Sequence, residues 1–366
     1  MRTTSFIIAA IAAVISASAQ ASPYYGRPHL DFIGEATFAT GFRFEGFEVG
    51  GLSGIDYDKT NDRYIAISDD RAQNGPARFY DLTIDLSDGV LNDGDIAFTN
   101  VTEIVDQDGS TFVPGSVDPE SIRLAPFPNI LYWSSEGDAN NGVAPFVRAM
   151  TRDGQPLGEF ELPDKFIPTT ETGIRNNLAF ESLTFSYNQK HLFTATENAL
   201  IQDGPAASVE QGSAVRVLRL NRLTGKPNRE YIYRTEPVAA EPIPAGAFST
   251  NGLVELLTIA PGKMIAIERS FSVGVGNSIK LFLTTTYGAT NVKRISAIDE
   301  RRYIRPMQKT LLLDLAELGI ELDNIEGITL GPRLPNGEQS LILVSDNNFN
   351  ANGQFTQFLA FTLSHY

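Results

Sequence analysis

Apolar residues in this chain occur in short runs, alternating or continuous, that are interrupted by Gly, Pro, Asn and Asp. This spacing is typical of β-strands joined by turns, because a helix would repeat its apolar positions at its own period instead. The best helix candidate covers 311–318, and it can equally be a strand that runs into a turn at Gly319. The pattern therefore predicts an all-β protein.

The apolar runs recur as a unit that begins again about every 70 residues. An acid, a small or apolar residue and then Ile or Leu open four units, and Ser53-Gly54-Ile55 is the same motif without its acid. A turn and a second apolar strand follow each copy, and this strand ends in another carboxylate. The opening acids are Glu120, Glu181, Glu255 and Glu326, and the closing acids are Asp69, Glu136, Glu197, Glu268 and Asp346.

Four-stranded units repeated in a ring are the signature of a β-propeller, whose blades bury their faces against one another. We count five blades, with six as the alternative if a degenerate blade lies within a long insertion. The last unit has a third strand at 355–363 but no fourth, whereas 31–42 is a spare strand near the N-terminus. We therefore expect the N-terminal strand to close the ring. An outer-membrane barrel is disfavoured, because many runs are apolar on both faces of the strand.

The N-terminus has the pattern of a secretory signal, with Arg2, an apolar run over 6–15 and the small-residue motif Ala19-Gln20-Ala21. That run has about ten residues, half of the roughly twenty that cross a bilayer as a helix. We expect residues 1–21 to be removed and 22–366 to form one domain without a membrane span. The absence of cysteine fits bacterial export, so we expect a periplasmic or extracellular protein. We also expect it to be a monomer.

Composition narrows the possible functions. The chain has no cysteine, which excludes thiol nucleophiles and cysteine-ligated zinc. Its 44 acidic and 29 basic residues give a formal charge of −15, which repels nucleic acids and favours cations as partners. The repeat serines Ser53, Ser121 and Ser182 lack a Gly-x-Ser-x-Gly context and an accompanying His, which disfavours a Ser-His-Asp hydrolase.

The repeated acids are expected to share one rim of the ring. If the first strand of each blade runs down the channel and the second runs back, their opening and closing acids lie at the same end. So many carboxylates cannot all stay ionised at close range without a cation. Oxygen ligands suit Ca²⁺, with Mg²⁺ as the alternative. The candidate metal ligands are Asp69, Asp70, Glu120, Glu136, Glu255, Glu268, Glu326 and Asp346.

Basic residues near these acids complete a hypothetical hydrolytic site. Arg71, Arg123 and Arg269 are the candidates for binding a phosphate or carboxylate group of a small substrate. Glu181 or Glu197 would act as general base, and Arg175 would stabilise the transition state. Repeated acids can instead cap backbone N–H groups or pair with arginines, which would suit a non-catalytic propeller that binds an extracellular ligand or protein.

The order of the motifs resembles the phytase-like family, described as having esterase-like activity of phytase. The resemblance spans nearly all of the mature chain and implies an exported bacterial propeller that hydrolyses a phosphorylated or ester substrate. The chain lacks the Asp-Asp-Pro-Ala motif of calcium-dependent propeller phytases, so its similarity to those enzymes is one of architecture. The motifs that carry the resemblance are GLSGIDYD (51–58), ISDDR (67–71), DPESI (118–122), GIRNNLAFESL (173–183), ATENAL (195–200), IERS (267–270), IEGI (325–328) and VSDNNF (344–349).

Overall fold

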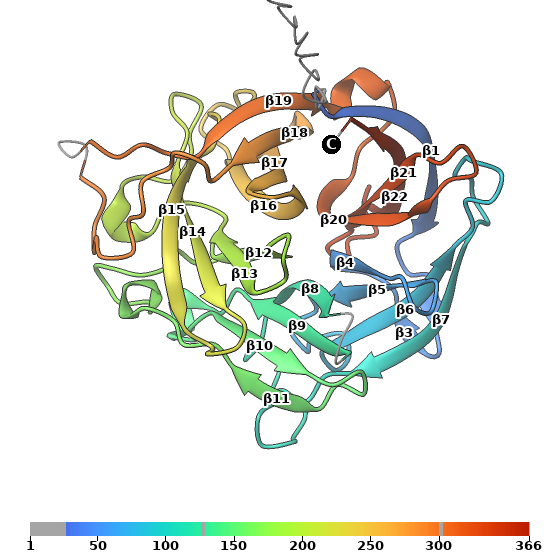
Figure 1. Cartoon of the computed structure of the whole chain (residues 1–366), viewed down its shortest axis with the longest axis horizontal. Coiled ribbons are helices and arrows are strands. Elements are labelled where there is room, and N and C mark those ends of the chain that lie inside the picture. Colours follow the sequence, from blue (N-terminus) through green and yellow to red (C-terminus); the bar gives the residue numbers. More distant parts are fainter. Residues whose placement is uncertain (1–26, 126–128, 300–302, 366) are drawn as a thin grey trace, which may run out of the picture.

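The computed structural model describes residues 27–125, 129–299 and 303–365. Within these ranges the chain forms five four-stranded antiparallel sheets, arranged as blades around a central channel (Figure 1). This confirms the all-β fold and the count of five blades. The described residues contain only four short 3-10 helices, none of them long or apolar enough to span a membrane. The expected signal peptide, 1–21, lies outside the described residues.

In each blade the first strand lines the channel and the fourth lies at the outer edge (Figure 1). Blade one comprises β4 (Leu52–Asp58), β5 (Arg63–Ser68), β6 (Arg78–Ile84) and β7 (Ile96–Glu103). Blade two comprises β8 (Pro119–Ala125), β9 (Ile130–Ser135), β10 (Phe146–Met150) and β11 (Pro156–Glu159). Blade three comprises β12 (Phe180–Phe185), β13 (His191–Thr196), β14 (Ala214–Asn221) and β15 (Pro227–Arg234).

Blade four comprises β16 (Ser249–Ala260), β17 (Lys263–Ser272), β18 (Gly276–Thr285) and β19 (Gln308–Asp314). Blade five comprises β20 (Asn324–Arg333), β21 (Gln339–Asp346), β22 (Phe355–Ser364) and the N-terminal strand β1 (His29–Ala39). The remaining elements are the small hairpin β2 (Arg43–Phe44) and β3 (Phe47–Glu48), and the 3-10 helices η1 (Ala139–Asn141), η2 (Asp164–Phe166), η3 (Ile201–Asp203) and η4 (Leu315–Leu318).

The ambiguous segment 311–318 contains the end of strand β19 and the short 3-10 helix η4. Strand β19 ends at Asp314, whose side chain accepts a hydrogen bond from the backbone N–H of Ala316 and so caps η4. The helix ends at Gly319, which adopts a left-handed φ of 68°. Gly tolerates this conformation because it has no Cβ, so the turn stops the chain from continuing as a longer helix.

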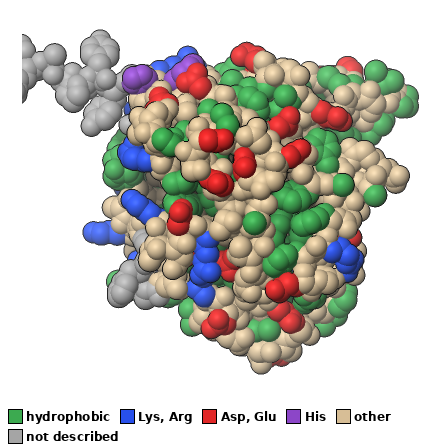
Figure 2. Space-filling view, turned by 90° about the vertical axis from the view of Figure 1, so that its right-hand side faces the viewer, with side chains coloured by type: hydrophobic (Ala, Val, Ile, Leu, Met, Phe, Trp, Pro, Cys, Tyr) green, Lys and Arg blue, Asp and Glu red, His purple; other side chains and the backbone are tan. Residues whose placement is uncertain are grey.

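Side chains on both faces of the inner strands are buried, because each blade packs between two neighbours. In β5, Ile65 and Ile67 belong to the apolar cluster shared with Trp133 of blade two. The alternate residues Tyr64 and Ala66 belong to the cluster shared with blade five. The continuous apolar runs thus follow from the two-residue period of a strand that is covered on both sides. On the outer face shown in Figure 2, by contrast, acidic side chains are scattered among neutral and apolar ones.

The N-terminal strand closes the ring, as expected. Strand β1 pairs antiparallel with β22 from His29 opposite Ser364 to Ala39 opposite Phe355, with one bulge at Phe32/Gly34. The two ends of the chain therefore complete one sheet, which Figure 1 shows as a blue strand beside the dark red ones. The ring cannot open between blades five and one without the loss of this ladder.

A buried ion pair fills the centre of the channel. Nη2 of Arg123 lies 2.8 Å from Oε2 of Glu255, and the two side chains are 2% and 0% exposed. Arg123 also donates to the carbonyl oxygens of Ile55 and Ile328. Glu255 accepts hydrogen bonds from the Ser121 hydroxyl at 2.6 Å and from the Leu183 N–H at 2.9 Å. The pair therefore contacts the first strand of all five blades.

Loss of one partner of this pair should destabilise the whole ring. We expect Arg123→Met to lower the free energy of unfolding by about 3 kcal/mol, because it leaves the Glu255 carboxyl buried without its cation. Chemical denaturation monitored by circular dichroism measures the change. Lys226→Met is the control, since Lys226 and its partner Glu161 are both largely exposed and should contribute little. Equal stabilities of the two variants would contradict the role of the ion pair.

Removal of the closing strand should abolish cooperative unfolding. A variant that begins at Arg43 loses β1 and exposes the backbone groups of β22, so we expect a broad thermal transition and aggregation. A variant that begins at Arg27 keeps β1 and serves as the control. Thermal unfolding of the shorter variant at the same temperature and with the same sharpness would show that closure does not depend on β1.

Candidate functional site

Every blade carries a β-bulge at the same place, near the start of its first strand. The register of the first two strands shifts after Leu52, Pro119, Phe180, Leu253 and Ile325. A bulge adds a residue to one strand and redirects its side chain, and bulges are frequent beside active sites. The first residue inside each shift, in the order of the blades, is Ser53, Glu120, Glu181, Val254 or Glu326.

A second ring of equivalent positions comes from the ends of the second strands. The residues opposite the bulges' starting points are Ser68, Ser135, Thr196, Glu268 and Ser345. The next residue in each blade is Asp69, Glu136, Glu197, Arg269 or Asp346. The two rings thus combine seven carboxylates with one arginine, one serine and one valine. The fivefold repetition is broken in blades one and four.

The register of blade four corrects the alignment made from the sequence. The repeated motif places Glu255 and Glu268 with the acids of the other blades, but the structure shows both one residue out of register. Because side chains alternate along a strand, a shift of one residue changes the environment completely. Glu255 lies in the channel with Arg123, and Glu268 accepts hydrogen bonds from Tyr233 and Lys309. Neither side chain lines the cavity at the rim.

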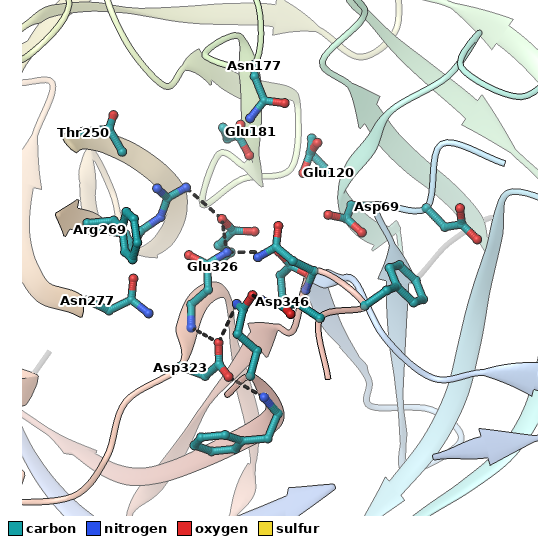
Figure 3. Close-up of a pocket in the computed structure, with 18 of the residues that line it drawn as sticks. Asp69, Glu120, Asn177, Glu181, Thr250, Arg269, Asn277, Asp323, Glu326 and Asp346 are labelled. Atoms are coloured by element: carbon teal, nitrogen blue, oxygen red, sulfur yellow. Dashed lines mark hydrogen bonds and ion pairs between the residues drawn. The ribbon is translucent and has the colours of Figure 1, made fainter. Parts of the chain in front are cut away.

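The other acids gather at one cavity. It has a volume of about 890 Å³ and lies at the rim end of the channel (Figure 3). In Figure 3, Asp69, Glu120, Glu181, Glu326 and Asp346 lie around the middle of the cavity, and carboxylate oxygens of Glu120, Glu181 and Glu326 are within 4.8 Å of one another. Glu136 lies behind these side chains and does not line the cavity itself. The acidic residues that line the cavity are Asp69, Asp70, Asp118, Glu120, Glu181, Glu197, Glu321, Asp323, Glu326 and Asp346.

Three overlapping triads of carboxylates are close enough to share a cation. Within each triad, one oxygen of each carboxylate lies within 4.8 Å of the others. Glu120, Glu136 and Glu181 each belong to two of these triads, so they stand at the centre of the cluster. The triads are Asp118, Glu120 and Glu136; Glu120, Glu181 and Glu326; and Glu136, Glu181 and Glu197.

Several of these carboxylates lack the hydrogen bonds that buried charges normally accept. Glu120 is only 6% exposed, and its carboxylate has no hydrogen bond or ion pair within the described chain. Oε1 of Glu197 is buried without a hydrogen bond, although Nη2 of Arg269 lies 3.6 Å away. Glu197 fits only because residue 252 is Gly, where a Cβ would stand 2.1 Å from Oε1. Unpaired buried carboxylates are costly, and a bound cation would remove that cost.

Burial and mutual repulsion raise the pKa of the clustered acids. Burial is the larger cause for Glu136 and Glu197, and it raises the pKa of each from 4.5 to about 7. The pKa of Glu120 is well above its ordinary value because of burial and then of the charge on Glu181. Burial followed by the charges on Glu136 and Glu197 likewise raises the pKa of Glu181. Without a cation, the cluster therefore favours protonated carboxyl groups near neutral pH.

Two arginines line the cavity, and both already contact carboxylates. Arg71 pairs with Asp118 and donates to the side-chain oxygen of Asn177 at 2.5 Å. Nη2 of Arg269 lies 3.0 Å from Oε1 of Glu326 (Figure 3). Burial favours the neutral form of Arg71, but Asp118, Glu136 and Glu120 together outweigh burial and raise the pKa of Arg71. Both guanidinium groups therefore remain charged.

Three predicted site residues contribute differently from the expectation. Arg175 donates to the carbonyl oxygens of Ala199 and Gly204 at 3.0 and 2.6 Å, so it braces its loop outside the cavity. Asp70 lines the cavity, but it pairs with the buried Arg78 at 2.7 Å and accepts backbone hydrogen bonds within its loop. Arg123 belongs to the ion pair in the channel.

Sequence reasoning missed Asp118 and Asp323 as members of the site. Asp118 precedes Glu120 by two residues, and this spacing in an extended segment was an available signal for a shared face. Asp323 accepts hydrogen bonds from the N–H groups of Asn324 and Phe355, so it organises the loop beside the cavity (Figure 3). The amide of Asn324 bridges Glu326 and Asp346 at 3.0 Å to each.

The available ligand atoms fit a hard divalent cation. Carboxylate and amide oxygens surround the cavity, and no His is among the residues that line it. Ca²⁺ and Mg²⁺ prefer such oxygen ligands, whereas softer metals prefer nitrogen or sulfur. The unpartnered Glu120 carboxylate and the three triads provide several places for such an ion.

The fold and the site define a five-bladed β-propeller with a carboxylate-lined cavity at one end of its channel. The family described as phytase-like, esterase-like activity of phytase, matches residues 48–349, and the chain belongs to this family. No curated protein matches the chain in a sequence comparison.

Solved structures with a similar chain course share little sequence with this protein. An endo-arabinase from Bacteroides thetaiotaomicron is 13% identical with a TM-score of 0.45, covering 86% of this chain and 94% of its own. An α-L-arabinofuranosidase from Lactobacillus brevis is 10% identical with a TM-score of 0.46, covering 85% of this chain and 91% of its own. At these values neither protein informs the chemistry of this chain.

The raised pKa values of the acids predict a stability that falls with rising pH. Between pH 4.5 and about 7 the folded protein holds protons on Glu136 and Glu197 that the unfolded chain releases. Their contribution to the free energy of folding is therefore fully present below pH 4.5, falls as the pH rises through this range, and is lost above about pH 7. In the presence of a chelator, we expect a melting temperature several degrees higher at pH 5 than at pH 8, measured by differential scanning fluorimetry.

Added Ca²⁺ should raise the melting temperature at pH 8 more than at pH 5, because it binds the ionised cluster. Glu136→Gln should weaken both effects, because Glu136 has a raised pKa and belongs to two triads, and Glu161→Gln, which changes an exposed acid paired with Lys226, should weaken neither. A melting temperature that rises with pH in the chelated protein would contradict the interpretation of the cluster.

Proposed function

We propose that this protein is an exported, divalent-cation-dependent hydrolase of small phosphoesters, with its active site in the carboxylate-lined cavity. The observation that carries the proposal is the group of buried acids, including the unpartnered Glu120, on a cavity that two arginines also line. A structural role alone would lead us to expect paired acids repeated in every blade. Here the repeat is broken by Ser53, Val254 and Arg269.

The cation would be held where the triads overlap, by Glu120 and Glu181 with help from Asp118, Glu136 or Glu326. We propose Ca²⁺, with Mg²⁺ as the alternative, because all of these ligand atoms are oxygens. When bound, a hard cation would neutralise the carboxylates and polarise a phosphoryl oxygen of the substrate.

The two arginines are suited to an anionic substrate group. Arg71 and Arg269 come from different blades and both line the cavity. A phosphate bound between them would have a guanidinium group on either side. Planar guanidinium groups form paired hydrogen bonds with phosphate oxygens. In the free protein these arginines form ion pairs with Asp118 and Glu326, which keep the guanidinium groups oriented.

Glu197 is the best placed general base among the residues that line the cavity. Glu197 lines the cavity, and burial raises its pKa to about 7, close to the pH at which a general base works best. As the water oxygen bonds to phosphorus, the bond from phosphorus to the ester oxygen breaks and the leaving alcohol takes up a proton. Glu181 is the second candidate, although its place in two triads suits cation binding better.

Exchange of Glu197 should separate catalysis from binding. We expect Glu197→Gln to lower kcat by about a hundredfold or more, the usual effect of losing a general base, while cation affinity changes less. Glu120→Gln should instead weaken Ca²⁺ binding by calorimetry and lower activity in proportion. A panel of phosphomonoester, phosphodiester and carboxylester substrates, each with and without Ca²⁺, measures the activity.

Glu161→Gln is the matched control, since it removes an exposed carboxylate outside the cavity. If calorimetry detects neither Ca²⁺ nor Mg²⁺ binding and no substrate is hydrolysed, the protein is instead a non-catalytic propeller that binds an extracellular ligand or protein.

A further inference from the structure

Blade four rises above the rim that the other blades share. Strands β16 and β17 stay paired outward from Gly252 opposite Arg269 to Ser249 opposite Ser272. In blades one to three the second strand ends one residue before its rim acid, at Ser68, Ser135 and Thr196. Strand β18 extends the sheet further, since Ser272 pairs with Gly276. The N–H of Val273 donates to the carbonyl oxygen of Phe248 at 3.0 Å. We call this extension, residues 248–252, 269–272 and the turn 273–276, the blade-four wall.

The inner face of the blade-four wall changes from charged to apolar with distance from the acids. Phe271 follows Arg269 by two residues on β17, so their side chains share one face about 7 Å apart. The ring centroids of Phe248 and Phe271 lie 6.2 Å apart. Thr250 pairs with Phe271 on the neighbouring strand. Phe248, Thr250 and Phe271 all line the cavity. Figure 3 shows Thr250 and Arg269 on the side opposite Asp69 and Glu120.

The outer end of the wall continues as an exposed apolar lip. Phe248 is 65% exposed, Ile243 is 65% exposed and Val275 is 52% exposed. The N–H of Ile243 donates to the carbonyl oxygen of Val273 at 2.7 Å, which fixes the loop before β16 against the turn after β17. Large apolar side chains gathered beside a cavity usually mark a binding surface.

The charges of the cavity limit the anions that it can accept. Arg71 and Arg269 are the basic residues among those that line it, and each is already paired with a carboxylate. A ligand with many phosphate groups would place most of them near acids, and like charges at close range are unfavourable. A ligand with one anionic group and an apolar remainder matches both the two arginines and the wall.

We propose that the blade-four wall binds the apolar or aromatic body of the substrate, and that the preferred esters are monophosphates with an apolar leaving group. The identity of the anionic end rests on the proposed function, but binding at the wall requires no catalysis. The wall therefore selects among substrates through Phe248 and Phe271, while the acids and arginines at its foot receive the phosphate.

Binding of two phosphonates tests the wall without hydrolysis. In the presence of Ca²⁺, we expect phenylphosphonate to bind at least about tenfold more tightly than methylphosphonate, because its ring is buried against Phe271 and Phe248. Calorimetry with the full protein measures both affinities. Phe271→Ala and Phe248→Ala should each remove most of the difference, and Leu223→Ala, at a 94% exposed residue between β14 and β15, should leave it unchanged.

Kinetics provides the second measurement. With naphthyl phosphate as substrate, Phe248→Ala should raise KM about tenfold with kcat little changed, and with glycerol phosphate it should change neither. Because Phe248 is largely exposed, this variant should keep the fold even if Phe271→Ala is less stable.

The outcomes separate this inference from the proposed function. If no ester is hydrolysed but phenylphosphonate binds preferentially through the two Phe residues, the wall is supported and the hydrolase proposal fails. If esters are hydrolysed but both phosphonates bind equally, or neither binds, or the Phe variants have no effect, the wall proposal is overturned. Tighter binding of inositol hexakisphosphate that is insensitive to both Phe variants would also overturn it.

Discussion

The ion pair between Arg123 and Glu255 is the contact that the rest of the propeller depends on, because it reaches the first strand of every blade. Its hydrogen bonds satisfy backbone groups that face the channel and would otherwise be buried without partners. The pair also fills the channel at its centre, and the acidic cavity lies towards one rim. A ring sealed at its centre presents its polar site to ligands that arrive from that rim.

The clustered acids at the rim destabilise the folded protein, and the surrounding sheets hold them in place. Seven carboxylates of two structural rings converge there, and burial and repulsion raise the pKa of those at its centre. Bulges in the first strands direct three of these acids, Glu120, Glu181 and Glu326, into the channel, and the paired strands around them prevent the cluster from spreading. Arg269 relieves part of the repulsion from the fourth blade, where the other blades carry an acid. A rigid fold can thus maintain an arrangement that its own electrostatics disfavour, as functional sites often require.

Much of the fold was predictable because the cause lies in local pattern. The alternation of apolar residues predicted the strands, the repeat predicted five blades, and the spare strand at 31–42 predicted closure against β22. Six of the predicted metal ligands line the cavity or its triads. Glu255 and Glu268 were misplaced, because each stands one residue from the position that the other blades fill with an acid, and the motif alone does not fix the register to one residue. Arg175 was misplaced because nearness along a loop does not decide which carbonyl oxygens a side chain reaches.

The sequence by itself determined that this chain forms a closed ring of four-stranded blades with acids at one rim, since periodicity and repetition are local properties that need no distances. Only the tertiary structure decided which acids meet. Arg269 occupies the position at which the other blades have a carboxylate, and Glu255 is paired with Arg123. The blade-four wall brings Phe271 beside the cavity. These features depend on a one-residue register and on contacts between blades that are far apart in the sequence. The residue pattern of a single chain does not show which distant residues come into contact.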